Sequence, residues 1–194
     1  MRGVEQIPAL YDAMLTVFEL SGLAAWRRWL VNGARGVTLD VGCGTGRNLP
    51  LYAAGVQVVG VDPHPQNLAR AHRRRPDVPL VQASAEALPF RDGSFETVVS
   101  GLGFCSVPDA AKGLAEVRRV LDRSGQLRML EHVRSRGRLG ARWQDLVQPA
   151  WTKVSGGCHP NRDTEAAVES AGFAIEEEGR RAEKNLRRFS ARPR

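Results

Sequence analysis

Three glycines at alternate positions, placed directly after a short apolar run, constrain this chain more than any other feature. Residues 37–41 read Val-Thr-Leu-Asp-Val, which is typical of a strand buried on both faces. Gly42, Gly44 and Gly46 follow, and a helix-compatible segment begins near Asn48. Strand, glycine turn and helix form the nucleotide-binding unit of doubly wound sheets, in which glycines permit a tight turn and a close approach of ligand to backbone. A glycine motif by itself is weak evidence, so its neighbours must agree with it.

Two acids near this turn narrow the choice of ligand. Asp40, at the strand end, would repel a pyrophosphate docked on the helix N-terminus and attract a cationic group. The next predicted strand, residues 58–62, ends in Asp62, where an acid accepts hydrogen bonds from ribose hydroxyls. The third glycine also comes one residue earlier than in the dinucleotide-binding fingerprint. A ligand that contains a ribose and a cationic centre but no pyrophosphate fits the description of S-adenosylmethionine. NAD is the alternative.

The rest of the chain alternates between strand and helix patterns. Further strands are predicted at residues 80–83, 95–100 and 127–132, from 173, and at 185–190; helices are predicted at 48–54, 65–74, 109–121 and from 163. Strands separated by helices require a parallel sheet with helices on both faces. The length of 194 residues suits a single domain. We therefore expect an α/β fold, a Rossmann-like, doubly wound and mostly parallel sheet of seven strands.

With these motifs in order, the sequence resembles the class I S-adenosylmethionine-dependent methyltransferases of the type 11 group over about residues 37–178. The resemblance implies an antiparallel seventh strand and S-adenosylmethionine as the cofactor. It places residues 84–90 beside the adenine, although Ser84 stands where these enzymes commonly have Asp or Gly. The implied cofactor-binding residues are Asp40, Gly42, Cys43, Gly44, Gly46, Asp62, Pro63, Ser84, Ala85, Glu86 and Gly101. Residues 101–107 leave the carboxyl end of a strand, so we expect them to face the transferring methyl group.

A finer similarity lies in residues 103–107, 130–133 and 151–164. These pieces look like the methyltransferase-like proteins that include animal thiol S-methyltransferases, whose bacterial relatives are often labelled phosphatidylethanolamine N-methyltransferases. The resemblance implies a small-molecule methyl acceptor, either a thiol or a lipid-like compound. A thiol needs no strong base, whereas an amine must first lose a proton.

Candidate bases lie at the expected acceptor side of the sheet. They are Glu131, His132 and His159, and for each of them a structural role is a competing interpretation. Cys158-His159 suggests a pair of metal ligands, but no other Cys/His cluster accompanies it in the sequence, so we expect no metal site. The aromatic residues Phe104, Trp143 and Trp151 are interpreted as core or pocket wall.

Two segments flank the predicted cofactor motifs. Residues 1–34 carry apolar side chains at helical spacing, which predicts a helical lid over the sheet or the cofactor. The alternation of tryptophan and arginine at residues 26–29 leaves contact with a membrane surface as an alternative. Residues 133–164 are predicted to be an insertion on the substrate side. We expect residues 1–194 to form one methyltransferase domain.

Composition limits the partners and the compartment. The net charge of +7 is spread along the chain without a nucleic-acid-binding module, which favours a solvated surface over nucleic-acid binding. No apolar run approaches the ~20 residues of a membrane span, and three cysteines form no disulfide framework, so we expect a cytoplasmic protein. Two alternatives remain, an RNA or protein methyltransferase, motivated by the charge, and an S-adenosylmethionine-binding module without catalysis. The oligomeric state is not predicted.

Overall fold

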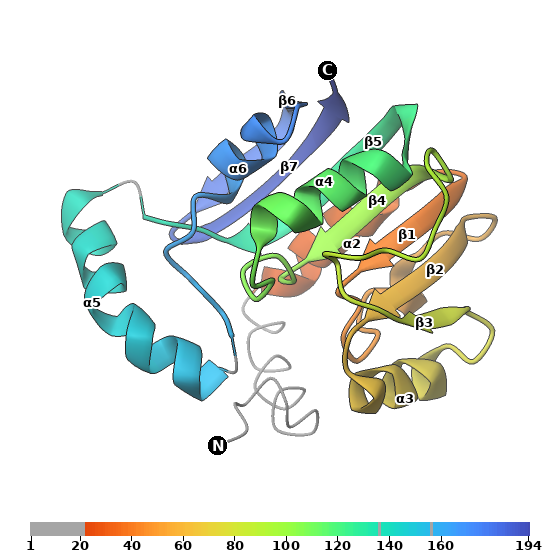
Figure 1. The fold of residues 1–194 in the computed structure, drawn as a ribbon, viewed down its shortest axis with the longest axis horizontal. Helices are drawn as coiled ribbons and strands as arrows, with labels where there is room; N and C mark the ends of the chain where they lie inside the picture. Colours follow the sequence, from red (N-terminus) through yellow and green to blue (C-terminus); the bar gives the residue numbers. More distant parts are fainter. Residues whose placement is uncertain (1–21, 136, 156) are drawn as a thin grey trace.

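The structure is a computed structural model that describes residues 22–135, 137–155 and 157–194. Within this part of the chain, seven strands form one sheet in the order β3-β2-β1-β4-β5-β7-β6 (Figure 1). The strands are β1 (Val37–Val41), β2 (Gln57–Asp62), β3 (Leu80–Gln82), β4 (Phe95–Gly101), β5 (Leu121–His132), β6 (Phe173–Glu183) and β7 (Leu186–Pro193). The helices are α2 (Ala24–Asn32), the 3₁₀-helix η3 (Leu49–Leu51), α3 (Pro65–Arg74), α4 (Ala110–Val120), α5 (Arg138–Ser155) and α6 (Thr164–Ser170).

The predicted fold class is confirmed. Strands β1 to β5 pair in parallel, and β7 runs antiparallel to both β5 and β6. The chain order changes direction between β1 and β4, since β2 and β3 lie to one side of β1 while β4 and β5 lie to the other. Ligands bind at such a switch point, outside the carboxyl ends of the strands.

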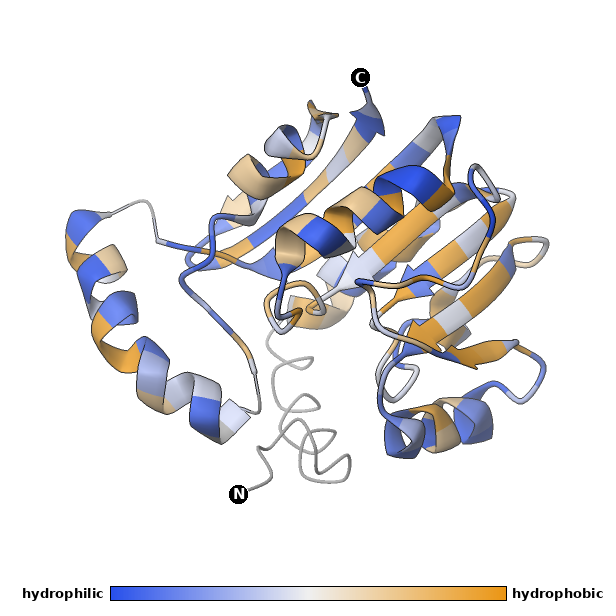
Figure 2. Cartoon of the chain, in the orientation of Figure 1, coloured by the Kyte–Doolittle hydropathy of each residue, from blue (hydrophilic) through white to orange (hydrophobic). Residues whose placement is uncertain are grey.

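Helices cover both faces of the sheet, as predicted. On one face, Leu114 and Val117 of α4 and Val168 of α6 pack on the strands. On the other, Leu30 of α2, Leu49 of η3 and Ala71 of α3 form a second buried layer. Figure 2 shows mostly apolar residues in the central strands β1, β2 and β4, and hydrophilic stretches along α3 and α4. The alternation of side chains along each strand thus supplies two separate cores.

The described part of the N-terminal segment packs on the sheet face. The ring of Trp29 lies 4.2 Å below the Arg128 guanidinium, and the same guanidinium donates hydrogen bonds to the backbone oxygens of Trp29 and Leu30 at the end of α2. Trp26 is 6% exposed and lies near two further guanidinium groups. The tryptophans at residues 26–29 therefore contact the arginines of this chain. Of the lid predicted for residues 1–34, residues 1–21 lie outside the described residues.

Helix α5 stands apart from the sheet (Figure 1) and keeps part of its apolar surface exposed. Trp143 is 64% exposed and Leu146 is 73% exposed. Trp143 is therefore not a core residue, and it is not among the residues that line the pocket described below. Phe104, in contrast, is fully buried in the core. None of the described helices, α5 included, has the length and apolar character needed to cross a membrane.

Two local elements differ from the sequence prediction. The helix predicted at residues 48–54 is only η3, because Tyr52 adopts an extended backbone after a single 3₁₀ turn. The strand predicted at residues 127–132 is longer, because β5 already begins at Leu121, and its pairing with β4 shifts register between Phe95 and Thr97. Neither difference moves the carboxyl ends of the strands.

Candidate functional site

A pocket opens at the carboxyl ends of β1, β2 and β4. Its wall is formed by Val41, Gly42, Gly44, Val61, Asp62, Pro63, His64, Asn67, Ala83, Ser84, Ala85, Leu102, Gly103, Phe104, Ser106, Val107 and Pro108. Six of the residues predicted from the sequence to bind a cofactor are among them, namely Gly42, Gly44, Asp62, Pro63, Ser84 and Ala85. The topology therefore brings residues from several motifs to one site.

The glycine turn has the backbone geometry that its sequence predicts. Gly42, Gly44 and Gly46 have φ angles of 68°, 55° and 80°, a conformation that side-chain-bearing residues rarely adopt. A Cβ on Gly44 would meet no atom closer than 3.9 Å, so space is open in front of this backbone. A Cβ on Gly46 would lie 2.8 Å from the Cα of Ala71, so this glycine serves the packing of α3 against the turn.

Asp62 is held at the tip of β2 by the groups around it. Its Oδ1 accepts hydrogen bonds from the His64 backbone N–H at 2.9 Å and the Asn67 amide at 3.2 Å. Its Oδ2 accepts one from the Gly44 backbone N–H at 3.0 Å. Burial raises the pKa of Asp62, and these three hydrogen bonds oppose that shift. The carboxylate is thus pre-positioned on the pocket wall, with room for a further donor at Oδ2.

Five predicted cofactor residues lie outside the pocket wall, namely Asp40, which is described below, and Cys43, Gly46, Glu86 and Gly101. Burial raises the pKa of the Cys43 thiol, and Gly101 approaches the side chains of α2 so closely that a Cβ would lie 2.9 Å from Leu30 Cδ2. Gly46 supports the turn as described above. Glu86 accepts a hydrogen bond from the Ser84 hydroxyl at 3.1 Å and one from the Asp109 backbone N–H at 2.7 Å. None of these four residues lines the pocket.

The structure places Asp40 away from the pocket wall. The carboxylate is fully buried on the α2 side of the sheet, where it accepts hydrogen bonds from the Tyr52 hydroxyl at 3.1 Å and the Asn48 amide at 3.5 Å. Arg27 in turn donates to Asn48 at 2.9 Å. Burial raises the pKa of Asp40 from 3.8 to about 7, although these partners lower it. An ionised Asp40 beside a cationic ligand therefore remains a prediction.

The raised pKa of Asp40 predicts a dependence of stability on pH. Between pH 3.8 and 7 the folded state holds a proton that the unfolded state has lost, so the free energy of unfolding decreases as pH rises. Asp40→Asn cannot ionise. Relative to wild type, we expect this variant to gain about 2 kcal/mol of stability between pH 5 and pH 7, measured by urea unfolding. Asp77→Asn is the control, because Asp77 is exposed, its pKa is lowered to about 2, and it stays ionised across this range. A parallel pH profile for Asp40→Asn and wild type would contradict the assignment.

Glu131 organises the loop after β4. Its fully buried carboxylate accepts hydrogen bonds from the Ser100 hydroxyl and from the backbone N–H groups of Gly103, Phe104 and Cys105, at 3.0 to 3.3 Å. Burial raises the pKa of Glu131, and these four donors oppose the shift. Because both oxygens are occupied and the side chain lies behind the pocket wall, Glu131 shapes the loop and is not placed to accept a proton from a substrate.

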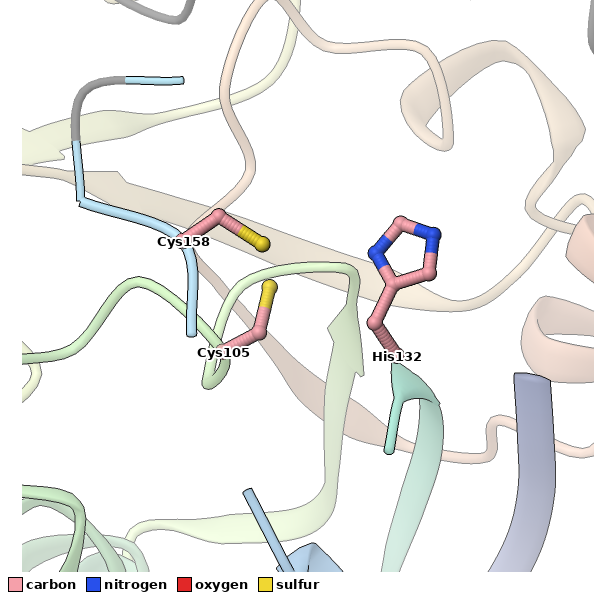
Figure 3. Close-up of side chains that lie close together, drawn as sticks. All are labelled: Cys105, His132 and Cys158. Carbon is pink, nitrogen blue, oxygen red and sulfur yellow. The ribbon is translucent and has the colours of Figure 1, made fainter. Parts of the chain in front are cut away.

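Cys105, His132 and Cys158 come together, as Figure 3 shows. They lie beside the pocket, because Ser106, which follows Cys105, lines the pocket wall. Their ligand-capable atoms all lie within 4.8 Å of one another, with a ring nitrogen of His132 facing the two sulfurs. The interpretation that no Cys/His cluster accompanies Cys158 is therefore wrong. Hydrogen bonding with Cys105 is the main effect that lowers the pKa of Cys158 to about 5, and His132 and Trp151 assist it against the effect of burial. We call these three residues the Cys-His-Cys cluster.

His159 lies next to the cluster without joining it. Its backbone N–H donates to the Cys105 carbonyl at 2.8 Å, and its buried Nδ1 has no hydrogen-bond partner. The side chain is not part of the pocket wall. Of the three candidate bases Glu131, His132 and His159, only His132 belongs to the Cys-His-Cys cluster.

Some site residues were missed by the sequence interpretation. Asn67 lies in the first turn of α3, and its position after Asp62 in the βα connection is the signal that could have identified it. The Cys-His-Cys cluster had no such signal, because its members lie in three separate parts of the chain and share no spacing motif.

Comparisons with known proteins show which family the chain resembles. The methyltransferase domain family matches residues 39–129. The chain is 34% identical to the thiol S-methyltransferase TMT1B of Rattus norvegicus over 144 residues, 70% of this chain and 59% of that protein. It is 32% identical to the thiol S-methyltransferase TMT1B of Homo sapiens over 178 residues, 84% of this chain and 73% of that protein. The chain thus spans less than two thirds of the rat protein.

A solved structure supports the fold. A methyltransferase of Thermotoga maritima, dependent on S-adenosylmethionine, superposes with a TM-score of 0.75. The match covers 98% of each chain at 19% sequence identity, which is evidence for the architecture alone.

Proposed function

The chain belongs to the S-adenosylmethionine-dependent methyltransferases, and we propose that it transfers a methyl group to the sulfur of a small thiol. The choice of a thiol rests on the side chains that lie next to the pocket, where we place the acceptor. Its buried carboxylate, Glu131, is occupied by four internal donors, while two cysteines and a histidine gather next to the pocket. Such a site suits an acceptor that needs no strong base.

The pocket has groups that fit each part of the cofactor. Asp62 Oδ2 can accept a hydrogen bond from a ribose hydroxyl, and the open space before Gly44 lets the ligand approach the backbone. Apolar surface from Leu102 and Val107, with Ser84 at its polar edge, suits the adenine. When bound, S-adenosylmethionine supplies a methyl group on a sulfonium. The residues of this chain hold the two reactants in contact and keep water away from them.

The chemical class of the acceptor determines whether the enzyme must supply a base to remove a proton from it. A thiol with a pKa of ~8.5 is already a few per cent thiolate near neutral pH, so positioning accounts for most of the catalysis. An amine would require a base within hydrogen-bond reach of its nitrogen. Among the described pocket residues, the one carboxylate is Asp62, which we assign to the ribose. This favours sulfur over nitrogen as the methylated atom.

We also propose that residues 133–164 form the acceptor side of one domain that spans residues 1–194. Cys158 from this segment contacts the loop after β4, and the Arg162 guanidinium donates to the backbone oxygens of Phe104 and Val107 at 2.5 and 2.7 Å. The segment is thereby tied to the loop on the pocket wall. Substrate selection by this segment is the expected consequence.

The test compares acceptors that differ in one atom. Methyl transfer from S-adenosylmethionine is measured by mass spectrometry with 2-mercaptoethanol, ethanolamine and ethylene glycol, and in parallel with phosphatidylethanolamine vesicles and a quinol. We expect the thiol to react at least about 10-fold faster than its amine and alcohol counterparts. Near pH 7 a thiol supplies some thiolate, which is a strong nucleophile, whereas the amine is almost fully protonated and the alcohol is un-ionised. Methylation confined to the lipid would overturn the thiol assignment. Cofactor binding without turnover of any acceptor would favour the non-catalytic alternative.

A further inference from the structure

The Cys-His-Cys cluster is built from three parts of the chain that meet only in the fold. Cys105 lies in the loop after β4, His132 ends β5, and Cys158 follows α5 (Figure 3). Two of the side chains are almost fully buried, Cys105 at 2% and Cys158 at 3% exposure, whereas His132 is partly exposed. Two thiols and an imidazole that converge in this way make a ligand set of soft and borderline donors.

We propose that Cys105, His132 and Cys158 bind a Zn²⁺ ion, and that its fourth position takes the thiolate of the methyl acceptor. The second half of this proposal rests on the proposed function, whereas the metal site stands without it. A Cys₂His set with one open position is the arrangement of catalytic zinc sites, while structural zinc sites use four protein ligands. Among the described residues, no fourth Cys, His, Asp or Glu joins this group.

The dimensions of the cluster suit a tetrahedral ion. Zn–S bonds of about 2.3 Å and a Zn–N bond of about 2.0 Å place the ligand atoms of a tetrahedron about 3.5 to 3.8 Å apart. The ligand atoms here lie within 4.8 Å of one another, so any pair needs to approach by at most about 1.3 Å. Rotation of the cysteine side chains supplies such a movement without a change in the backbone.

The backbone of the cluster is already held in place. The Cys105 N–H donates to Glu131 at 3.3 Å, and the Cys105 carbonyl accepts the His159 N–H at 2.8 Å. The Cys158 N–H donates to the Ser155 hydroxyl at 3.1 Å, and its carbonyl accepts the Thr152 hydroxyl at 2.9 Å. Ligands fixed in this way lose little freedom when an ion binds, which favours binding.

The cluster lies next to the wall of the cofactor pocket. The Sγ of Cys105 lies 3.8 Å from the hydroxyl of Ser106, and Ser106 is part of the pocket wall. The cluster thus adjoins the pocket wall through Ser106, and we place the open position of the ion on this side. His132, being partly exposed, leaves the site accessible to solvent.

Methyl transfer to a thiolate bound at this Zn²⁺ site conserves atoms, electrons and charge. Two thiolates and a neutral imidazole bring the charge of the Zn²⁺ site to zero, and a bound acceptor thiol loses its proton to solvent and makes it −1. The thiolate sulfur then attacks the methyl carbon, and the bond from the sulfonium to that carbon breaks as its electron pair returns to the donor sulfur. The product is a neutral thioether, a weaker ligand than a thiolate, so it can leave.

Metal binding is tested directly, without turnover. The chain is purified in reductant, stripped with a chelator, and titrated with Zn²⁺ against a chromophoric competitor and with Co²⁺ by visible absorption. We expect one ion per chain, and for Co²⁺ the bands of a tetrahedral site with thiolate charge transfer. Cys105→Ser, Cys158→Ser and His132→Gln are each expected to weaken Zn²⁺ binding by more than about 100-fold, the upper end of second-shell effects. Cys43→Ser and His159→Gln are matched controls, expected to bind Zn²⁺ within about threefold of wild type because neither residue belongs to the cluster.

Two outcomes would overturn the metal site. One is the absence of stoichiometric Zn²⁺ binding by the folded, reduced chain, and the other is an equal loss of binding in the control variants. The acceptor role is tested by adding 2-mercaptoethanol to the Co²⁺ form with S-adenosylhomocysteine present. A stronger thiolate band supports coordination of the acceptor, whereas an unchanged spectrum overturns it. If Zn²⁺ binds but no thiol is methylated in the acceptor panel, the proposed function fails and the metal site stands.

Discussion

Asp62→Ala is expected to weaken the binding of S-adenosylmethionine by about 100-fold. The carboxylate would be lost as acceptor for a ribose hydroxyl, and a hydrogen bond to a charged group contributes about 1.5 to 3 kcal/mol. The backbone N–H groups of Gly44 and His64 would also lose their shared partner, which loosens the glycine turn. Isothermal titration of wild type and variant measures the change.

Two further variants separate the charge of Asp62 from its structural role. Asp62→Asn keeps an oxygen for the His64 N–H and the Asn67 amide, and we expect a loss of only about 10-fold, the size of one charged hydrogen bond. Asp77→Ala removes an exposed acid outside the pocket wall and is expected to leave binding unchanged. Affinity of Asp62→Ala within twofold of wild type would remove Asp62 from the ribose role.

Glu131→Ala is expected to lower the free energy of unfolding by about 4 kcal/mol, with a fall in Tm of roughly 8 to 16 °C. The change leaves three backbone N–H groups and the Ser100 hydroxyl without their acceptor, in a fully buried position. Each buried unsatisfied group costs about 1 to 3 kcal/mol, and relaxation of the loop offsets part of the sum. Urea unfolding followed by circular dichroism gives the free energy.

Two further variants test whether the lost hydrogen bonds of Glu131 cause this fall in stability. Glu131→Gln keeps one acceptor oxygen but presents an amide to the remaining donors, so we expect a loss of about 2 kcal/mol. Glu178→Ala, at an exposed site on β6, is expected to stay within about 0.5 kcal/mol of wild type. If Glu131→Ala were as stable as wild type but inactive, Glu131 would be a catalytic residue instead of a support for the loop.

Much of the fold could be predicted from the sequence because its signals are local. The apolar run at residues 37–41, the glycines after it and the acid at Asp62 specify a strand, a turn and the tip of the next strand. Helix α3 begins and ends where its prolines and arginines predict, and Asp109 caps α4 by accepting the Lys112 N–H. Each of these features depends on residues close together in the chain, so spacing alone determines it.

The direction in which a strand residue points could not be predicted in the same way. Leu39 and Val41 pack on the α4 side of the sheet, so the alternation of side chains sends Asp40 to the α2 side. The sequence shows this alternation but not which face carries the pocket. Asp40 therefore became a buried acid with a raised pKa, although its position beside the glycine turn favoured contact with the cofactor.

Only the tertiary structure brought Cys105, His132 and Cys158 together. The first two lie at the ends of neighbouring strands β4 and β5, whose pairing depends on the order of the whole sheet, and Cys158 returns to them after helix α5. The sequence by itself determined the doubly wound fold and the cofactor, since strands, turns and helix ends are set by neighbouring residues. The acceptor side was decided by strand order, register and a long connection, because contacts between distant residues leave no spacing in the sequence.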